Sequence, residues 1–187
     1  MNIKRAMFLI AGAFLIVAIF LPFLGISLKS PQYPTRNPKI LLYVHSLRGD
    51  IKEWEILGRY IGINANPKLP EFDFKIFIFI FAGLAIMLGI AAFLGDRWKK
   101  AASIALIIAS LIIAGWAQYK LYQQGHTLDP AAPLRTVAKP FTPPLFGITR
   151  IHKITIYHYP HLGSALLGLT IASTVYAAWL HKSPGKS

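Results

Sequence analysis

Four long apolar runs constrain this chain more than any other feature of its sequence. They cover about residues 6–25, 74–94, 101–121 and 162–180. Each is near the roughly 20 residues that a helix needs to cross a hydrocarbon layer about 30 Å thick. The chain is 55% hydrophobic, above the roughly 45–50% of soluble domains, and the runs hold the excess. The sequence therefore predicts an all-α membrane protein with four transmembrane helices and a small outward-facing segment of strand plus helix.

Basic residues in the short segments predict the orientation. They lie before the first run, between the second and third runs, and in the tail: Lys4, Arg5, Arg97, Lys99, Lys100, Lys182 and Lys186. With four spans these segments share one side of the membrane, and an excess of Lys and Arg marks the cytoplasmic side. We therefore expect a multi-pass protein of the cell inner membrane with cytoplasmic N- and C-termini, whose two long connections face the periplasm.

This orientation divides the chain into five consecutive segments. The first run has no small-residue cleavage site after it, so we expect a retained anchor and not a signal peptide. The segments are an N-terminal transmembrane anchor (1–25), a periplasmic segment with a strand and an amphipathic helix (26–73), a transmembrane hairpin (74–121), a periplasmic Pro-rich segment (122–161), and the last transmembrane helix with a cytoplasmic tail (162–187).

The net charge of +13 comes from 20 Lys and Arg against 7 Asp and Glu. On a soluble chain this excess would indicate nucleic-acid binding. Here the basic residues flank apolar runs and no nucleic-acid motif accompanies them. We therefore expect contact with anionic membrane lipids and no nucleic-acid partner.

The runs carry no ionisable side chain in their central parts, and the chain has no Cys. Pumps, proton-coupled carriers and voltage sensors need ionisable groups at membrane depth. We therefore predict no enzyme activity, no catalytic residue and no bound cofactor. A transporter or quinone-binding protein is disfavoured for the same reason.

The first outward segment contains an amphipathic helix predicted over residues 51–62. Asp50 and Glu53 match the two acidic positions of a capping box at its start. Trp54 and Tyr60 fall near one face of it. A helix this short is marginal alone and must dock on something. We therefore predict partner contact through Asp50, Glu53, Trp54 and Tyr60.

Two strands are predicted in the outward segments, over residues 39–45 and 151–157. The first is rich in apolar and β-branched residues, and the second alternates apolar and polar residues. Pairing the two would form a small lid over the helical bundle.

Histidines gather near the second strand, and they are the candidate metal ligands. His158 and His161 are separated by two residues, and His152 lies on the same stretch. Imidazoles bind copper or zinc, and no Cys competes. The alternative is that these rings are interfacial or hydrogen-bonded within the protein, because the spacing matches no familiar copper or zinc motif.

Two stretches carry a resemblance to a known group of proteins. The pattern runs through Gly49, Asp50, Glu53, Leu57, Tyr60, Ile61 and Gly62, and again through Pro160, Gly163 and Ser164 at the entry to the last run. It resembles small multi-spanning membrane proteins that accompany nitrous-oxide reductase in denitrifiers. The resemblance covers about a fifth of the chain and contains no catalytic motif. It implies an accessory role in the maturation or electron supply of that copper enzyme.

The leading hypothesis is a non-enzymatic membrane accessory protein. It would assist the assembly, anchoring or electron delivery of a periplasmic respiratory redox enzyme, with copper as the candidate metal. The alternative is a small structural subunit of a membrane respiratory complex. Either role predicts membrane or periplasmic respiratory proteins as partners.

Overall fold

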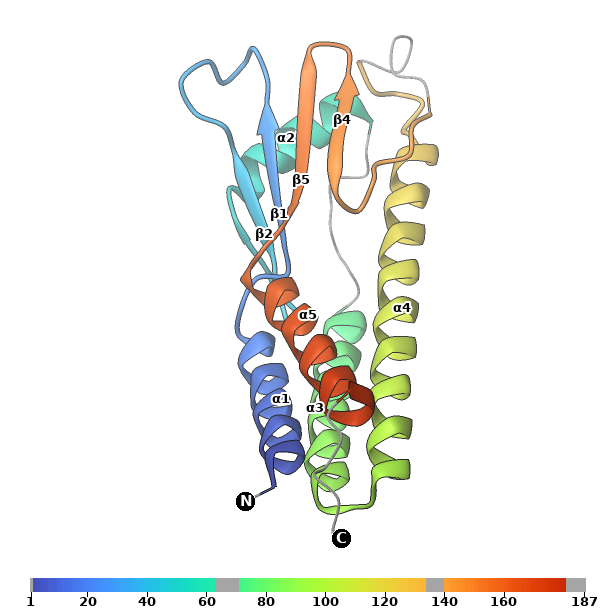
Figure 1. The fold of residues 1–187 in the computed structure, drawn as a ribbon. Coiled ribbons are helices and arrows are strands. Elements are labelled where there is room, and N and C mark those ends of the chain that lie inside the picture. The colour runs from blue at the N-terminus through green and yellow to red at the C-terminus, as the bar shows by residue number, and fades with distance from the viewer. Residues whose placement is uncertain (1, 63–70, 134–139, 181–187) are drawn as a thin grey trace, which may run out of the picture.

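The computed structural model describes residues 2–62, 71–133 and 140–180. In this part of the chain, a helical bundle carries an antiparallel sheet at one end, and a further helix crosses the sheet (Figure 1). The bundle helices are α1 (Ile3–Ile19), α3 (Glu71–Phe93), α4 (Asp96–His126) and α5 (Leu162–Val175), the last extended by a π-helical turn (Tyr176–Leu180).

The sheet has five strands in the order β3-β2-β1-β5-β4, each antiparallel to its neighbours. The strands are β1 (Leu24–Lys29), β2 (Lys39–Leu42), β3 (Leu47–Gly49), β4 (Gly147–Ile151) and β5 (Ile154–Pro160). Helix α2 (Ile51–Ile61) lies on one face of this sheet (Figure 1).

The central strands join the sheet directly to the bundle. Strand β1 follows α1, and β5 leads into α5. Where the two connections meet, the Gly163 amide donates to the carbonyl oxygen of Pro22 at 2.8 Å and the His161 amide donates to that of Phe23 at 3.1 Å. The sheet is therefore connected to two bundle helices, α1 and α5, and is not attached to the bundle through a single loop.

The prediction of an all-α protein with four transmembrane helices is wrong, because the fold is mixed α/β. Within the described ranges, three helices are long and apolar enough to cross a membrane: Lys75–Phe93, Asp96–His126 and Leu162–Trp179. These three candidate spans are compatible with a membrane protein.

The error in the number of predicted spans comes from the first apolar run. We predicted a span over residues 6–25, whereas α1 ends at Ile19 after 17 residues, or about 26 Å of helix. Pro22 follows, and residues 24–29 then form β1, in which the apolar residues Leu24, Ile26 and Leu28 alternate with Gly25, Ser27 and Lys29 as in a strand. The last part of the run therefore belongs to the sheet.

The predicted pairing of the two outward strands is also wrong. Strands β2 and β5 lie in the same sheet, but each pairs with β1, which separates them. The stretch predicted as one strand over 151–157 instead turns at His152 and Lys153, between β4 and β5. His152 has a φ of 53°, which is a left-handed conformation. In tight hairpins this conformation is usually adopted by Gly or Asn, so a His at this position did not predict the turn.

The bundle is packed inside and apolar outside. Phe8, Leu15, Leu88 and Leu106 are fully buried among α1, α3 and α4. On the outer surface Phe79 is 74% exposed, and other large apolar side chains of α3 and α4 are also exposed. Soluble proteins rarely leave such a surface uncovered, whereas helices surrounded by lipid require it.

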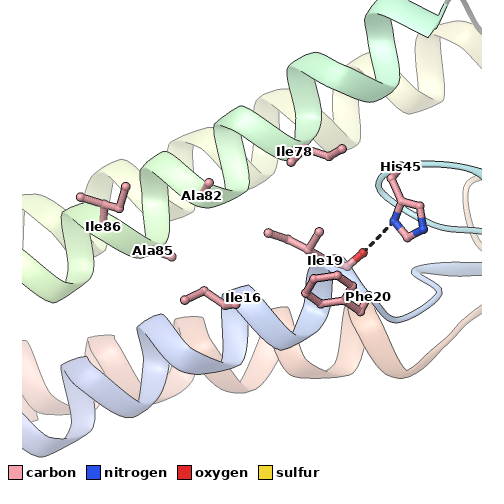
Figure 2. A pocket seen from close by; sticks show the side chains of 8 residues that line it. All are labelled: Ile16, Ile19, Phe20, His45, Ile78, Ala82, Ala85 and Ile86. Atoms are coloured by element: carbon pink, nitrogen blue, oxygen red, sulfur yellow. Dashed lines mark hydrogen bonds between the residues drawn. The ribbon is translucent and has the colours of Figure 1, made fainter.

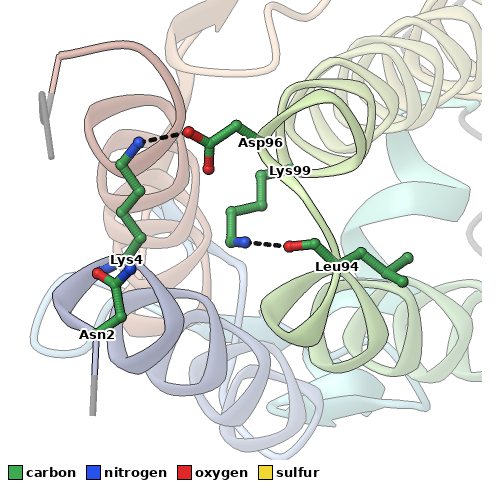
Figure 3. A network of polar contacts seen from close by, with 5 residues as sticks. All are labelled: Asn2, Lys4, Leu94, Asp96 and Lys99. Atoms are coloured by element: carbon green, nitrogen blue, oxygen red, sulfur yellow. Dashed lines mark hydrogen bonds and ion pairs between the residues drawn. The ribbon is translucent and has the colours of Figure 1, made fainter. Parts of the chain in front are cut away.

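Polar contacts close the bundle end that lies away from the sheet (Figure 3). The Lys4 ammonium donates to the Asp96 carboxylate at 2.8 Å, which joins the start of α1 to the start of α4. The Lys99 ammonium, which is also buried, donates to the carbonyl oxygen of Leu94 in the α3–α4 turn. Lys182 and Lys186, part of the orientation argument, lie outside the described residues.

Candidate functional site: the bare face of the sheet

The strand register sorts the sheet residues onto two faces. One, the covered face, lies beneath α2 and includes Leu24, Ile26, Leu28, Ile40, Leu42, Leu47, Thr149, Ile151, Ile154, Ile156 and His158. The other, the bare face, consists of Gly25, Ser27, Lys29, Lys39, Leu41, Arg48, Ile148, Arg150, Thr155, Tyr157 and Tyr159. Side chains alternate along a strand, so neighbouring residues fall on opposite faces.

Helix α2 covers its face of the sheet because its apolar residues recur at helical spacing. Leu57 and Ile61 are buried against Leu28, Ile154 and Ile156. Gly62 ends the helix with a left-handed φ of 87°, as a C-terminal glycine does. Its carbonyl oxygen then accepts from the Asp129 amide at 2.8 Å, which ties α2 to the segment after α4.

The bare face has no such cover, since none of the described helices crosses it (Figure 1). Its residues form three rows across the sheet. Lys29, Thr155 and Arg150 lie opposite one another in the first row; Lys39, Ser27, Tyr157 and Ile148 form the second; Arg48, Leu41, Gly25 and Tyr159 form the third. Every row therefore contains at least one cation.

The four cations of the bare face are Lys29, Lys39, Arg48 and Arg150, and all four residues are exposed. The strand residues of this face include no Asp or Glu. One acid, Asp50, follows β3 at the edge of this face, and its carboxylate accepts from the Lys39 amide and from the Arg36 guanidinium. The bare face thus presents four cations against one carboxylate, which is already paired with Arg36.

Aromatic rings lie among these cations. The Arg48 guanidinium is 5.1 Å from the centre of the Tyr43 ring. Tyr159 lies over Gly25, where a Cβ would overlap the tyrosine ring. Tyr157 and Ile148 are 36% and 54% exposed. A surface of Arg, Tyr and an exposed aliphatic side chain has the composition found at protein–protein contacts.

The residues predicted for partner contact are divided by the structure. Tyr60 is exposed on α2, but Trp54 packs into the core beneath the sheet, and Glu53 is half-buried. Asp50 precedes α2 without forming the predicted capping box, because its carboxylate binds the Lys39 amide and Arg36 instead. Trp54 is thus partly buried against this core, and partner contact through these four residues stays a prediction.

The three candidate metal ligands are spread along the β4–β5 hairpin. His152 is exposed in its turn, His158 is buried on the covered face, and His161 caps α5 through its Nδ1, which accepts from the Leu162 amide at 2.9 Å. His152 and His158 are six residues apart along a strand, or about 20 Å. The structure does not bring the three together.

Burial lowers the pKa of His158 below its ordinary value, and a hydrogen bond from its Nδ1 to the carbonyl oxygen of Pro144 partly opposes that shift. Thr149 lies on the same covered face, and its buried hydroxyl has no hydrogen-bond partner in the described part of the chain. His158 and Thr149 are therefore interior groups of the unit formed by the five-stranded sheet and α2 (the sheet unit).

An apolar groove lies between α1 and α3, where the two helices diverge toward the sheet (Figure 2). The helices approach each other closely at Gly12, where a Cβ would be 3.2 Å from the carbonyl oxygen of Ala85. The groove has a volume of about 440 Å³, and its one polar lining residue is His45. The His45 Nδ1 donates to the carbonyl oxygen of Ile19 at 3.1 Å and so caps the end of α1.

Comparison with profiles of known families, with curated proteins and with solved structures found no match to this chain.

Sequence reasoning missed the bare face because it missed β1, the central strand. The signal was present: Leu24, Ile26 and Leu28 alternate with Gly25, Ser27 and Lys29, the pattern of a half-buried strand. It was hidden because its first residues continue an apolar run that already predicted a transmembrane helix.

Proposed function

We propose that this chain is a non-enzymatic accessory protein of the cell inner membrane, which docks a periplasmic respiratory redox enzyme through its sheet unit. Its role would be the assembly, anchoring or electron supply of that enzyme. The observation that supports this best is a sheet covered on one face only, fixed to a bundle with an apolar outer surface.

The orientation in this proposal follows from the charge at the two ends of the bundle. The end away from the sheet combines the start of α1 with the α3–α4 turn, and it holds Lys4, Arg5, Arg97, Lys99 and Lys100. The positive-inside tendency places these short basic segments in the cytoplasm. The sheet unit then lies in the periplasm.

Copper enters the proposal only through the resemblance to proteins that accompany nitrous-oxide reductase. That the partner is a copper enzyme stays a prediction. The scattered positions of His152, His158 and His161 give it no added support.

The second candidate is a permanent structural subunit of a respiratory complex. One observation favours it: the outer side of α4 exposes Leu111 and Ile112 at 68% and 65%, a strip that another membrane subunit as well as lipid can cover. In this case the bundle and not the sheet would make the principal contact.

Photo-crosslinking in the source cells separates the two. A photoreactive residue at Thr155 samples the bare face, and one at Ile112 samples the outer side of α4. The accessory proposal expects a cofactor-bearing redox chain crosslinked at Thr155, substoichiometric after purification in mild detergent, and lower activity of that enzyme when the gene is deleted. Stoichiometric recovery with crosslinking at Ile112 alone supports the subunit. If neither site captures a redox chain and deletion changes no respiratory activity, the proposal is wrong.

A further inference from the structure

We infer that the bare face binds an acidic protein surface, by charge pairing with Lys29, Lys39, Arg48 and Arg150. This inference rests on the proposed function and names the chemistry of the partner. All four residues are exposed, and they are spread over β1, β2, β3 and β4. A complementary partner needs carboxylates spread over a similar width.

The basic character of this face is not a simple consequence of the net charge of +13. Helix α2, on the opposite side of the same unit, carries both signs of charge: Lys52 and Arg59 are accompanied by Glu53 and Glu55. The bare face has four cations and, at its β3 edge, one acid, Asp50, which is paired with Arg36. Segregation of one sign of charge on one face is what steers a partner of opposite charge.

The direction of the strands argues against the nearby membrane as the anionic partner. In Figure 1, β1 and β5 run in roughly the same direction as the bundle helices. The bare face therefore stands upright relative to a membrane that the bundle crosses. A flat lipid surface would meet only the lower edge of this face, whereas an upright protein can lie against all three rows.

The side chains between the cations favour a protein over a polymer that offers charge alone. Tyr157 and Ile148 lie opposite each other in the second row and are both exposed. Tyrosine and arginine are enriched where proteins contact proteins. A partner with carboxylates around an apolar centre matches the composition of this face.

The bare face is small and its cations are exposed. Seven residues of β5 extend about 23 Å, and five strands span about 19 Å. Binding through exposed charges on this face is expected to weaken strongly with salt, because such charges are screened over about 8 Å at physiological ionic strength.

The test uses the full chain in nanodiscs of phosphatidylcholine and a short polyglutamate peptide as the carboxylate probe. The test variant combines Lys29→Glu with Arg150→Glu, and the control variant combines Lys52→Glu with Arg59→Glu on α2. Both variants have the same net charge. We expect the bare-face variant to bind the probe on the order of tenfold more weakly than the control, and we expect added salt to weaken the binding of the unchanged protein. Equal loss in both variants, or no loss in either, would overturn the inference.

Two further probes separate acidic protein from other anions. Vesicles containing phosphatidylglycerol and single-stranded DNA are offered to the same proteins. Tighter binding of either one than of polyglutamate, lost in the bare-face variant, would assign the face to lipid or nucleic acid and would overturn the inference.

The crosslinking experiment at Thr155 can refute this inference without refuting the proposed function. A redox enzyme captured at Thr155 equally well by the unchanged protein and by the bare-face variant refutes charge pairing while supporting the proposed function. Capture that is lost in the bare-face variant and kept in the α2 variant supports both. If no redox enzyme is captured, the proposed function fails, and the inference, which names the partner of that function, fails with it.

Discussion

Neighbouring residues of β5 show how sharply the two faces of the sheet differ. Ile156 is 2% exposed beneath α2, and Tyr157 is 36% exposed on the bare face. The covered face is aliphatic with a few enclosed polar groups, whereas the bare face is cationic and aromatic. The same strands supply both faces. The difference between the faces therefore comes from the alternation of residue types along each strand and from the packing of α2 on one face. One face packs against α2, and no described helix covers the other.

Ile156→Ala should destabilise the sheet much more than Tyr157→Ala does. Truncating a fully buried aliphatic side chain typically costs about 2–5 kcal/mol. The Tyr157 side chain is already partly in solvent. Its truncation removes mainly the cross-strand contact with Ile148, which is worth about 1 kcal/mol or less. Hydrogen exchange of the β1 and β5 amides measures the opening free energy of the sheet. Similar losses for the two variants would contradict the assignment of the faces.

Gly25→Ala should destabilise the sheet although Gly25 lies on the bare face. The added Cβ would overlap the Tyr159 ring, and overpacking of this kind costs about 1–3 kcal/mol. A second substitution, Tyr159→Ser, removes the ring and should recover most of the loss. Thermal unfolding of the single and double variants checks both steps. Additive losses would show that the ring does not lie over Gly25.

Thr149→Val on the covered face should stabilise the protein slightly. The substitution removes a buried hydroxyl that has no partner in the described part of the chain, and relieving such a group stabilises a protein by up to about 1 kcal/mol. Thr155→Val on the bare face is the matched control and should change little. A loss of stability in Thr149→Val, measured by thermal unfolding, would mean that the hydroxyl is hydrogen-bonded.

The smallest effect near neutral pH is expected for His158, and it grows on acidification. Burial lowers the pKa of His158 in the folded state below its ordinary value of 6.5, so the unfolded chain binds the proton more readily. The contribution of this residue to stability is present above pH 6.5 and is lost as the pH falls toward the folded-state pKa. Unfolding measured between neutral and acidic pH should show a steeper loss in the unchanged protein than in His158→Gln. Identical pH profiles would place this ring in contact with water.

The sequence predicted the helices better than the sheet, for identifiable reasons. The predicted helix over residues 51–62 matches α2 and its glycine end, because amphipathic spacing and a C-terminal glycine are local signals. The runs at 74–94, 101–121 and 162–180 match α3, α4 and α5 with its π turn. An apolar run of about 20 residues has few alternatives to a helix.

The sheet depends on contacts between distant parts of the chain, and these are not visible locally. Strand β1 pairs with β5, which is more than a hundred residues later in the chain. This pairing determines which side chains of β1 lie on each face of the sheet. The β4–β5 turn at His152 lacks the Gly or Asn that would have predicted it. The candidate site was missed for the same reason, since the bare face exists only once β1 is placed at its centre.

Cysteine accessibility in intact cells can distinguish the two faces of the sheet, because the chain contains no Cys and single substitutions supply the only thiols. Thr155→Cys reports the bare face, and the adjacent Ile156→Cys reports the covered face. With a membrane-impermeant thiol reagent, we expect rapid labelling of the first variant and protection of the second until the protein is unfolded. Equal labelling of both would contradict the two-faced sheet, and labelling of Thr155→Cys only after lysis would place the sheet on the cytoplasmic side.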